Sequence, residues 1–180
     1  MVTLVLCFGV DQKRLFERWA IIITKDELEQ LGTRFRAAIV KARDNDEFRP
    51  VRWNKECMNE FPDDCCDDAS IMFGNYLFEN CMGQPSDLVT GHHFDENLGF
   101  SRGHTWLVVN NFVVDLTGDQ FKNDPQYKNF NIEVHVGAET SMHKVFNERR
   151  RKVHCYPIKY RDDDRELMQS KYDRVMKYFI

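Results

Sequence analysis

The sequence predicts an α+β fold, in which helices pack on a mostly antiparallel sheet. Three observations lead to this prediction. A capping box at Thr24–Glu27 opens an apolar helical pattern, residues 103–117 alternate like two strands around a tight turn, and helical periodicity returns after residue 162. Helices therefore stand before and after a run of strands, which is the order expected of an α+β domain.

The size and composition of the chain favour one domain. It has 180 residues, of which 42% are hydrophobic and 30% are charged, enough for a single sizeable core. We predict a single domain over residues 1–180, with a helical N-terminal part at 1–50, a central motif region at 61–122 and a C-terminal helix at 162–180.

Charge and hydropathy exclude some classes of partner. The net charge of −4 gives no support for nucleic-acid binding, and the basic run 148–152 is interpreted as a solvated helix end or loop. Met1–Val10 is apolar but too short to span a membrane, and it is a weak signal peptide. We interpret it as a buried strand or helix segment and expect a soluble, cytoplasmic protein without membrane contacts, although secretion as an effector stays open.

The cysteines favour a reducing compartment. There are six, at positions 7, 57, 65, 66, 81 and 155. Cys65 and Cys66 are adjacent, which suits ordinary disulfides poorly, and the chain is large enough to fold without them. Since no CxxC or HxxxH spacing occurs, we predict no structural zinc site, no other metal and no cofactor. His92, His93 and Asp95 could contact a metal, but a loop with two histidines is more often only a loop.

The helices are predicted from capping and spacing. Thr24 and Glu27 cap a helix that ends near Arg43, and a short helix at 13–20 precedes it. Asp63 or Asp64 is expected to cap the next helix, which ends near Cys81–Gly83. On that helix an apolar row of four residues at helical spacing includes the cysteine, so the thiol is expected to point inward: Cys66, Ala69, Phe73 and Leu77.

The remaining segments are assigned more coarsely. Residues 84–102 are read as a long loop that shapes a cleft, and residues 123–147 as a second contributor to it. Residues 131–136 and 154–160 are predicted to be strands, and residues 162–178 a charged helix.

The stretch 103–117 predicts a hairpin with a defined register. If Asn110 and Asn111 form a two-residue turn, His104 and Asp115 lie diagonally on one face, about 7–8 Å apart along the backbones. Trp106 shares that face, whereas the opposite face is almost wholly apolar. We expect the face with His104 and Asp115 to meet the face of the preceding helix that carries Cys66.

A cysteine at a helix start, a histidine and an aspartate can form a nucleophile, its base and the group that orients the base. A helix N-terminus and a neighbouring imidazolium both favour the thiolate. Four acidic residues around the cysteine, Asp63, Asp64, Asp67 and Asp68, have the opposite effect. We expect first-turn carboxylates to point to solvent while the thiol points inward.

Five pieces of the sequence together resemble the transglutaminase-like branch of the papain-like cysteine enzymes. They are Phe61–Pro62, Cys66–Ser70, Tyr76–Leu77, Gly103–Leu107 and Val114–Phe121. The resemblance covers roughly residues 50–122. It implies a papain-like fold and a Cys-His-Asp triad that acts on an amide, ester or thioester carbonyl.

By position, the resemblance makes Cys66 the nucleophile, His104 the base and Asp115 the orienting group. Asp67 stands where relatives often have glycine, and no upstream glutamine matches the oxyanion residue of papain-like proteases. Candidates for oxyanion or supporting roles are the Cys66 backbone N–H and the side chains of Trp53, Asn54, Trp106 and Gln120.

The predicted function is a cysteine-dependent acyl-transfer enzyme, a peptidase, amidase or deamidase that works through a thioester. Its substrate would be a peptide, a protein or a small amide. Two alternatives stay open: a non-catalytic binding module with the same fold, in which Cys66 is buried and inert, and a metal-binding regulator that uses His92, His93, Asp95 or the acidic helix start. The sequence does not specify the substrate, the acyl acceptor or the oligomeric state.

Overall fold

The computed structural model describes residues 23–48, 57–96, 99–124, 127, 130–155 and 162–180. Its centre is a sheet of five antiparallel strands in the order β4-β3-β2-β1-β5. The strands are β1 (Ser86–Asp95), β2 (Phe100–Val109), β3 (Phe112–Asp115), β4 (His135–Gly137) and β5 (Glu148–Cys155). The predicted α+β class with an antiparallel sheet is therefore confirmed.

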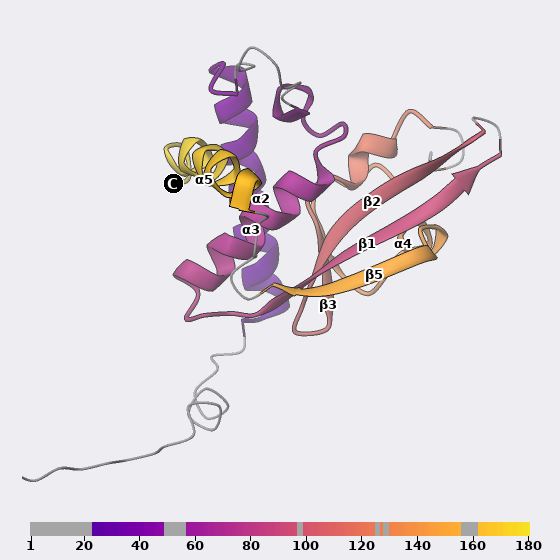
Figure 1. Cartoon of the computed structure of the whole chain (residues 1–180). Helices are drawn as coiled ribbons and strands as arrows, with labels where there is room; N and C mark the ends of the chain where they lie inside the picture. Colours follow the sequence, from indigo (N-terminus) through magenta and orange to yellow (C-terminus); the bar gives the residue numbers. More distant parts are fainter. Residues whose placement is uncertain (1–22, 49–56, 97–98, 125–126, 128–129, 156–161) are drawn as a thin grey trace, which may run out of the picture.

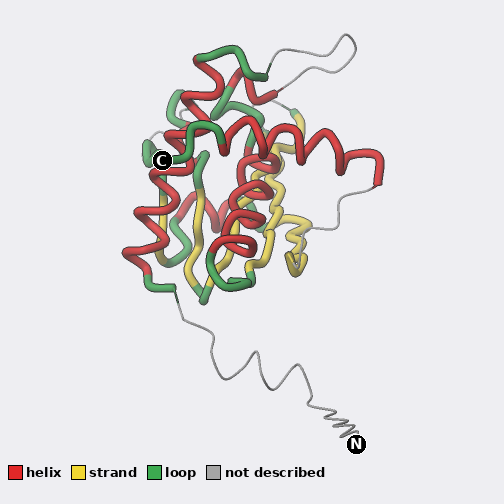
Figure 2. The backbone as a smooth tube through the Cα atoms, turned by 90° about the vertical axis from the view of Figure 1, so that its left-hand side faces the viewer, coloured by secondary structure: helices red, strands yellow, loops and turns green. Residues whose placement is uncertain are grey.

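Helices lie on both faces of the sheet, in unequal amounts. The helices are α2 (Lys25–Asp44), α3 (Cys66–Asn80), α4 (Ser141–Val145) and α5 (Asp162–Met176), with short 3₁₀ segments η1 (Cys57–Glu60) and η2 (Gly118–Phe121). The three long helices α2, α3 and α5 gather on one side, while β1, β2 and β5 extend away from them (Figure 1). Figure 2 shows these helices in front of the strands.

The helical face of the sheet carries the larger apolar core. Leu107 and Val109 of β2 pack there with Ala69, Phe73 and Leu77 of α3, and all five are almost completely buried. A fully buried side chain of this size contributes about 1.5–3 kcal/mol. This layer therefore supplies the main hydrophobic stabilisation of the fold.

The opposite face holds a second, smaller cluster that is rich in aromatic residues. Trp106 of β2 and Val113 of β3 lie in it, together with Phe121 after the hairpin and Phe146 after α4. Side chains alternate along a strand, so Trp106 and Leu107 necessarily point to different faces. β2 thus separates the helical core from the aromatic cluster.

Two local predictions are confirmed in detail. Thr24 caps α2, and its hydroxyl and backbone N–H exchange hydrogen bonds with Glu27 as a capping box. In the hairpin, Val109 pairs with Phe112, and both turn residues, Asn110 and Asn111, have positive φ (49° and 67°). Asparagine tolerates that conformation, and it is what a two-residue turn requires.

Other assignments are wrong. Residues 84–102 are not a loop, because β1 and the start of β2 run through them and pair from Asp87–Val108 to Asp95–Phe100. Gly91 explains part of this error, since a Cβ there would collide with the backbone carbonyl of Phe146. Glycine at this position marks a close approach between two segments and not a turn.

The later strands and one helix cap are also displaced. The basic run 148–152 belongs to β5 and not to a helix end or loop. Of the predicted strand 154–160, the first two residues are the end of β5, and residues 156–160 lie outside the described residues. Similarly, β4 covers His135–Gly137, at the end of the predicted strand 131–136. Helix α3 begins one residue after Cys65, which caps it without a side-chain hydrogen bond, so neither Asp63 nor Asp64 is the cap.

Some expectations fall outside the described residues, namely those for Met1–Val10, residues 13–20, and the side chains of Trp53 and Asn54. Among the helices that are described, none combines the length and the apolar character needed to cross a membrane.

Candidate active site

The site is built around the carboxylate of Asp115, the last residue of β3. One oxygen, Oδ1, accepts a hydrogen bond from the backbone N–H of Thr117 at 2.9 Å and from its hydroxyl at 3.3 Å. The other oxygen, Oδ2, lies 2.8 Å from Nε2 of His104. Both side chains are completely buried. A local turn therefore fixes the carboxylate, and its free oxygen faces the imidazole.

The hairpin register brings His104 to Asp115, as predicted. The β2–β3 ladder begins at Val109–Phe112 and ends at Leu107–Val114. Three residues earlier on β2, His104 lies on the same face as Trp106 and is the diagonal neighbour of Asp115. Because β3 ends at Asp115, the edge of β2 at His104 is open to other segments.

Cys66 approaches His104 from the first residue of α3. Its side chain is partly exposed, whereas Ala69, Phe73 and Leu77 on the same helix are completely buried. After Asp115, a hydrogen bond and a charge interaction with Cys66 are further causes of the raised pKa of His104. The expected meeting of the two faces is wrong: Ala69, Phe73 and Leu77 of α3 pack with Leu107 and Val109, on the face of β2 opposite to that of Trp106 and His104.

The acidic residues around Cys66 are arranged so that their effect on the thiol is reduced. Asp63, Asp64 and Asp67 are exposed to solvent, where water screens their charges. Asp68 is part-buried, and its Oδ2 lies 2.6 Å from Nζ of Lys171 on α5. Asp67 and Asp68 are the acidic residues in the first turn of α3, and the expectation that first-turn carboxylates point to solvent holds for Asp67, whereas Asp68 is paired with a cation.

The electrostatics favour a charged pair at His104 and Asp115. Burial by itself would lower the pKa of His104, but the charge and hydrogen bond of Asp115, with the Cys66 side chain, raise it to about 10. Burial would raise the pKa of Asp115, but His104 and His143 hold it well below its usual range. These two pKa shifts favour a protonated His104 beside an ionised Asp115.

Gln120, from η2, contacts the other ring nitrogen of His104. Its amide Nε2 lies 3.0 Å from the carbonyl oxygen of Thr117 and 3.1 Å from Nδ1 of His104. A carbonyl oxygen only accepts, so the amide nitrogen must face it, and the second N–H then points to Nδ1. Gln120 therefore favours an unprotonated Nδ1. This opposes the interactions with Asp115 and Cys66, which raise the pKa of His104 and favour the imidazolium.

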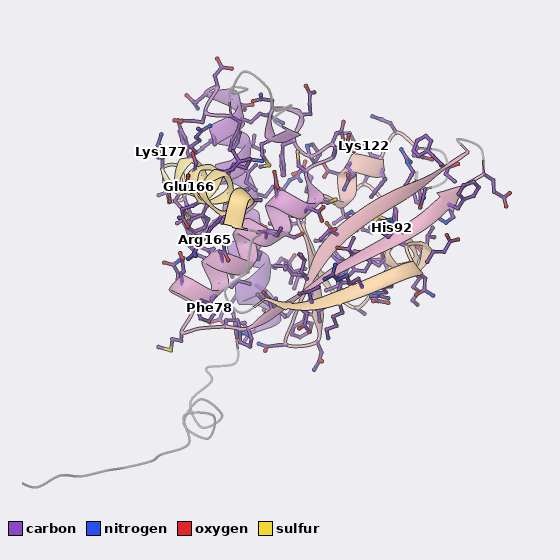
Figure 3. All side chains as sticks on the ribbon, viewed as in Figure 1. Phe78, His92, Lys122, Arg165, Glu166 and Lys177 are labelled. Atoms are coloured by element: carbon purple, nitrogen blue, oxygen red, sulfur yellow. The ribbon has the colours of Figure 1, made fainter. Side chains whose placement is uncertain are left out.

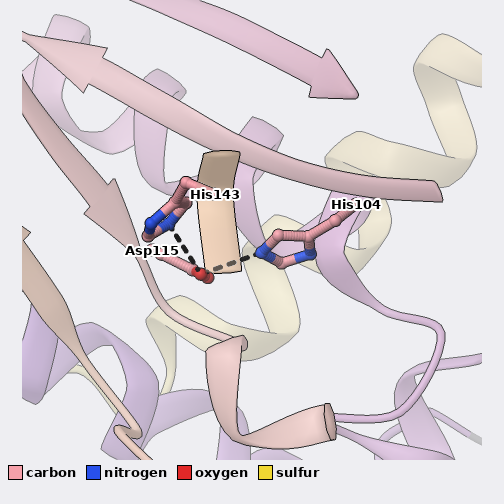
Figure 4. A group of neighbouring side chains, drawn as sticks. All are labelled: His104, Asp115 and His143. Atoms are coloured by element: carbon pink, nitrogen blue, oxygen red, sulfur yellow. Dashed lines mark hydrogen bonds and ion pairs between the residues drawn. The ribbon is translucent and has the colours of Figure 1, made fainter. Parts of the chain in front are cut away.

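A second histidine, His143 of α4, reaches the same carboxylate. Its Nε2 lies 3.3 Å from Oδ2 of Asp115, a longer contact than that of His104 and short of a well-formed hydrogen bond. In Figure 4 the two dashed lines meet at one oxygen, and Nδ1 of His104 points away from it. His143 was not predicted from the sequence.

Trp106 shields the buried side of the two histidines. It is completely buried, with its ring 5.5 Å from that of His104 and 5.0 Å from that of His143. The guanidinium of Arg150 lies over the indole at 5.1 Å. Phe121 and Phe146 enclose His104 from further directions, at 5.1 and 5.4 Å. Trp106 thus packs beside His104, as its place on the same face of the hairpin predicts.

Arg36 of α2 connects the helical layer to the segment that carries Asp115. Its guanidinium donates to the carbonyl of Leu116, and Nη2 lies 2.8 Å from Oδ2 of Asp119. It also lies over the ring of Phe61, 5.0 Å from its centre, in the segment before Cys66. One buried cation thus contacts both the hairpin end and the approach to α3.

His104, Asp115 and His143 are also the one group in the described part of the chain whose His, Cys, Asp or Glu side chains come close enough for a metal, within 4.8 Å. Their outer nitrogens do not suit this use. A histidine that binds metal through Nε2 usually donates Nδ1–H to an acceptor. Here Nδ1 of His104 faces the Gln120 amide, and Nδ1 of His143 faces the N–H of Thr140 at 3.2 Å. The surroundings favour two N–H donors to a carboxylate over a metal ion.

The histidines and aspartate proposed earlier as a metal site do not form such a group. His92, His93 and Asp95 lie on β1, and His92 is seen on the strands, away from the helical layer (Figure 3). A surface hollow of about 340 Å³ on the helical layer is lined by residues that include Leu31, Arg34 and Met82, none of which belongs to the Asp115 cluster.

The sequence contained local signals for two residues that were not predicted, Thr117 and His143. Asp115 and Thr117 have the two-residue spacing of a side chain that bonds the backbone ahead of it, a common turn of aspartate. Thr140 and His143 have the spacing of a capping box, with histidine in place of the usual glutamate. Neither pattern indicates that His143 and Asp115 meet, because no local spacing connects them.

Comparison with protein-family profiles, with curated proteins and with solved structures finds no match to this chain.

Proposed function

We propose that this chain is a cysteine-dependent acyl-transfer enzyme, a peptidase, amidase or deamidase with Cys66 as nucleophile, His104 as base and Asp115 as the orienting group. The observation that supports it is the position of His104, which contacts Asp115 through Nε2 and has the Cys66 side chain as a further partner. A helix-borne cysteine beside a sheet-borne histidine also supports a papain-like arrangement, of the transglutaminase-like kind.

The first step is proton transfer within the site. The Cys66 thiol gives its proton to Nδ1 of His104, and Asp115 stabilises the imidazolium through the 2.8 Å contact at Nε2. The N-terminus of α3 favours the thiolate that remains. Gln120 must yield its contact with Nδ1 as this nitrogen gains a hydrogen.

The next steps exchange bonds at the substrate carbonyl. The Cys66 sulfur forms a bond to the carbonyl carbon, and the carbonyl π electrons move to oxygen, for which the Cys66 backbone N–H is a natural donor. The C–N or C–O bond then breaks, and the proton of His104 passes to the leaving amine or alcohol. Water or an amine, deprotonated by His104, attacks the thioester and releases the thiolate.

Exposure in the site is consistent with this division of roles. Cys66 is partly exposed, so a substrate can reach it, whereas His104 and Asp115 are completely buried. Bulk water is therefore kept from the charged pair, which strengthens its interaction. His104 meets the leaving group and the attacking water or amine at Nδ1, after Gln120 has yielded its contact with that nitrogen. A peptide, a protein surface or a small amide could each present a carbonyl to such a thiol.

Alkylation of the native protein with iodoacetamide across pH, with the adducts mapped by mass spectrometry, tests the proposal. We expect Cys66 to react faster than every other cysteine near neutral pH, and His104→Ala to abolish this preference. A Cys66 that reacts no faster than Cys65 or Cys81 would reject the enzyme and leave a binding module with an inert thiol.

Two variants serve as matched controls for this experiment. Cys65→Ser removes the buried neighbouring thiol, which donates to the carbonyl of Asp63, and should leave the Cys66 adduct in place. His92→Gln changes a histidine of the same sheet outside the site. If His92→Gln lowered Cys66 labelling as strongly as His104→Ala, the effect of His104 would be one of general stability and not of chemistry.

A further inference from the structure

We propose that His143 is a positioning residue of this site: its imidazole holds the Asp115 carboxylate, so that His104 is the histidine that gains and loses the proton. The inference rests on the proposed function, because it assigns His143 to the centre formed by Cys66, His104 and Asp115. It adds a fourth side chain, from a different element, that the triad pattern does not contain.

His143 and His104 both contact the same oxygen atom of Asp115. Nε2 of His104 lies 2.8 Å from Oδ2 of Asp115, and Nε2 of His143 lies 3.3 Å from the same oxygen. All three side chains are completely buried. A carboxylate oxygen has two lone pairs and can accept from both rings at once.

The cap of α4 fixes which nitrogen of His143 carries hydrogen. The backbone N–H of Thr140 points to Nδ1 at 3.2 Å, and the Thr140 hydroxyl lies 2.8 Å from the same nitrogen. A backbone N–H only donates, so Nδ1 is the acceptor, and the neutral ring carries its hydrogen on Nε2. That hydrogen faces Oδ2 of Asp115 across the 3.3 Å separation, so the neutral ring supports the carboxylate through a weaker contact than that of His104.

The surroundings keep His143 neutral while His104 becomes charged. Burial lowers the pKa of His143, and the charges of His104 and His135 lower it further, against the opposing effect of Asp115. The same carboxylate raises the pKa of His104. The other ionisable neighbour is Glu139, before α4, which is paired with Arg150. Two histidines with opposite shifts on one carboxylate have separate roles.

In this arrangement His143 helps to hold the Asp115 carboxylate in place, and His104 alone exchanges a proton during the reaction. If the ring of His143 were removed, Oδ2 would keep a single donor, and the carboxylate would be held on one side by the Thr117 turn alone. The loss should be that of one neutral hydrogen bond, about five- to tenfold in the rate of Cys66 alkylation. It should be smaller than the loss caused by changing His104 or Asp115 themselves.

The first test reads the tautomers directly in the full-length wild-type chain. Long-range ¹H–¹⁵N spectra of the histidine rings, assigned with His143→Gln and His104→Gln, are recorded from about pH 5 to 8. We expect His143 to be a neutral ring with hydrogen on Nε2 near neutral pH, and to gain its proton only below the ordinary histidine range, because burial lowers its pKa. A His143 ring that is charged near neutral pH, or that carries its hydrogen on Nδ1, would overturn the inference.

The second test compares two substitutions at the same position. His143→Gln keeps an N–H donor near Oδ2, whereas His143→Leu removes it, and His135→Gln is the control on the adjacent strand. We expect the leucine variant to lower the Cys66 alkylation rate about five- to tenfold and the glutamine variant to recover most of it. Equal losses in both variants, or no loss in either, would contradict the positioning role.

The two proposals fail in different ways. If wild-type Cys66 shows no preferential reactivity, the enzyme proposal falls, and the ring spectra still decide the state of His143. If Cys66 is reactive in a His104-dependent manner but His143→Leu behaves like wild type, the triad stands and the fourth side chain does not.

Discussion

The two faces of the sheet show different uses of buried side chains. On the helical face, α2, α3 and α5 cover apolar residues such as Leu107 and Val109. On the other face, the short helix α4 and the segment after the hairpin cover His104, Asp115 and His143 among aromatic rings. The first face is stabilised mainly by apolar packing. On the second face, burial of polar groups costs free energy unless each group is paired, and this cost offsets part of the stabilisation from packing. Stability and chemistry should therefore respond to substitutions on different faces.

The largest expected effect is on the polar face. Asp115→Asn keeps the shape of the side chain but removes its charge, and its amide would turn His104 to the tautomer with hydrogen on Nδ1. We expect the Cys66 alkylation rate at neutral pH to fall by about 10- to 30-fold, to that of an ordinary thiol, which is only about 3% thiolate at pH 7, with the helical content in circular dichroism unchanged. An unchanged alkylation rate would show that Asp115 has no orienting role.

The helical face should show the reverse behaviour. Phe73 is completely buried, with its ring centre 5.2 Å from that of Phe35. Phe73→Ala should lower the free energy of unfolding in urea by about 3–5 kcal/mol, because it leaves a cavity in the main core. The rate of Cys66 alkylation in the folded protein should stay within about twofold. A large loss of the alkylation rate in a folded Phe73→Ala protein would contradict the separation of stability and chemistry between the two faces.

The ease of prediction also differed between the two faces. Thr24–Glu27 and the row Ala69, Phe73, Leu77 follow from capping and helical periodicity, and both lie on the helical face. The His104–Asp115 contact was predictable because the Asn110–Asn111 turn fixes the register of a local hairpin. His143 was not predictable, since it comes 28 residues after Asp115 in the sequence and its contact with that residue is decided by tertiary packing.

Two wrong assignments have the same physical origin. Residues 84–102 looked like a loop because glycine, histidine and aspartate stand where alternating apolar residues were expected. They form β1 and part of β2 because strand neighbours on both sides supply the hydrogen bonds, which outweighs local preference. The basic run 148–152 is the partner on the outer side, where an edge strand tolerates charge.

The pH dependence of stability should also reflect the polar face. The folded pKa of His104 is about 10 against 6.5 for the free side chain, so the folded chain binds more protons between these values, and stability falls as pH rises through them. The full contribution is present below pH 6.5 and, since the pKa of Asp115 is lowered from 3.8, it is lost again in acid.

Urea unfolding at a series of pH values measures this contribution. We expect the difference in unfolding free energy between wild type and His104→Gln to decrease by about 1–3 kcal/mol on going from pH 6.5 to 10. Taking the difference removes the effect of lysines and other cysteines that titrate in the same range. A difference that is constant with pH would mean that His104 stays neutral in the folded protein.

The smallest expected effect lies at the cap of α4. Thr140→Val removes the hydroxyl that lies 2.8 Å from Nδ1 of His143, while the backbone N–H remains. We expect a loss of about 0.5–2 kcal/mol in stability, the value of a helix cap, and a two- to threefold slower alkylation of Cys66. Thr140→Ser keeps the hydroxyl and should match wild type in both measurements. If the serine variant lost as much as the valine variant, the methyl group and not the hydrogen bond would be responsible.

The central claim is that His104 and Cys66 form a reactive pair at the open edge of β2. The ultraviolet absorbance of the thiolate, followed across pH and taken as the difference between wild type and Cys66→Ser, measures ionisation of this one thiol. We expect the wild-type protein to show the absorbance of the Cys66 thiolate at neutral pH, and His104→Gln to remove it. No Cys66 thiolate absorbance in the wild-type protein at neutral pH, or the same absorbance in His104→Gln, would contradict the account.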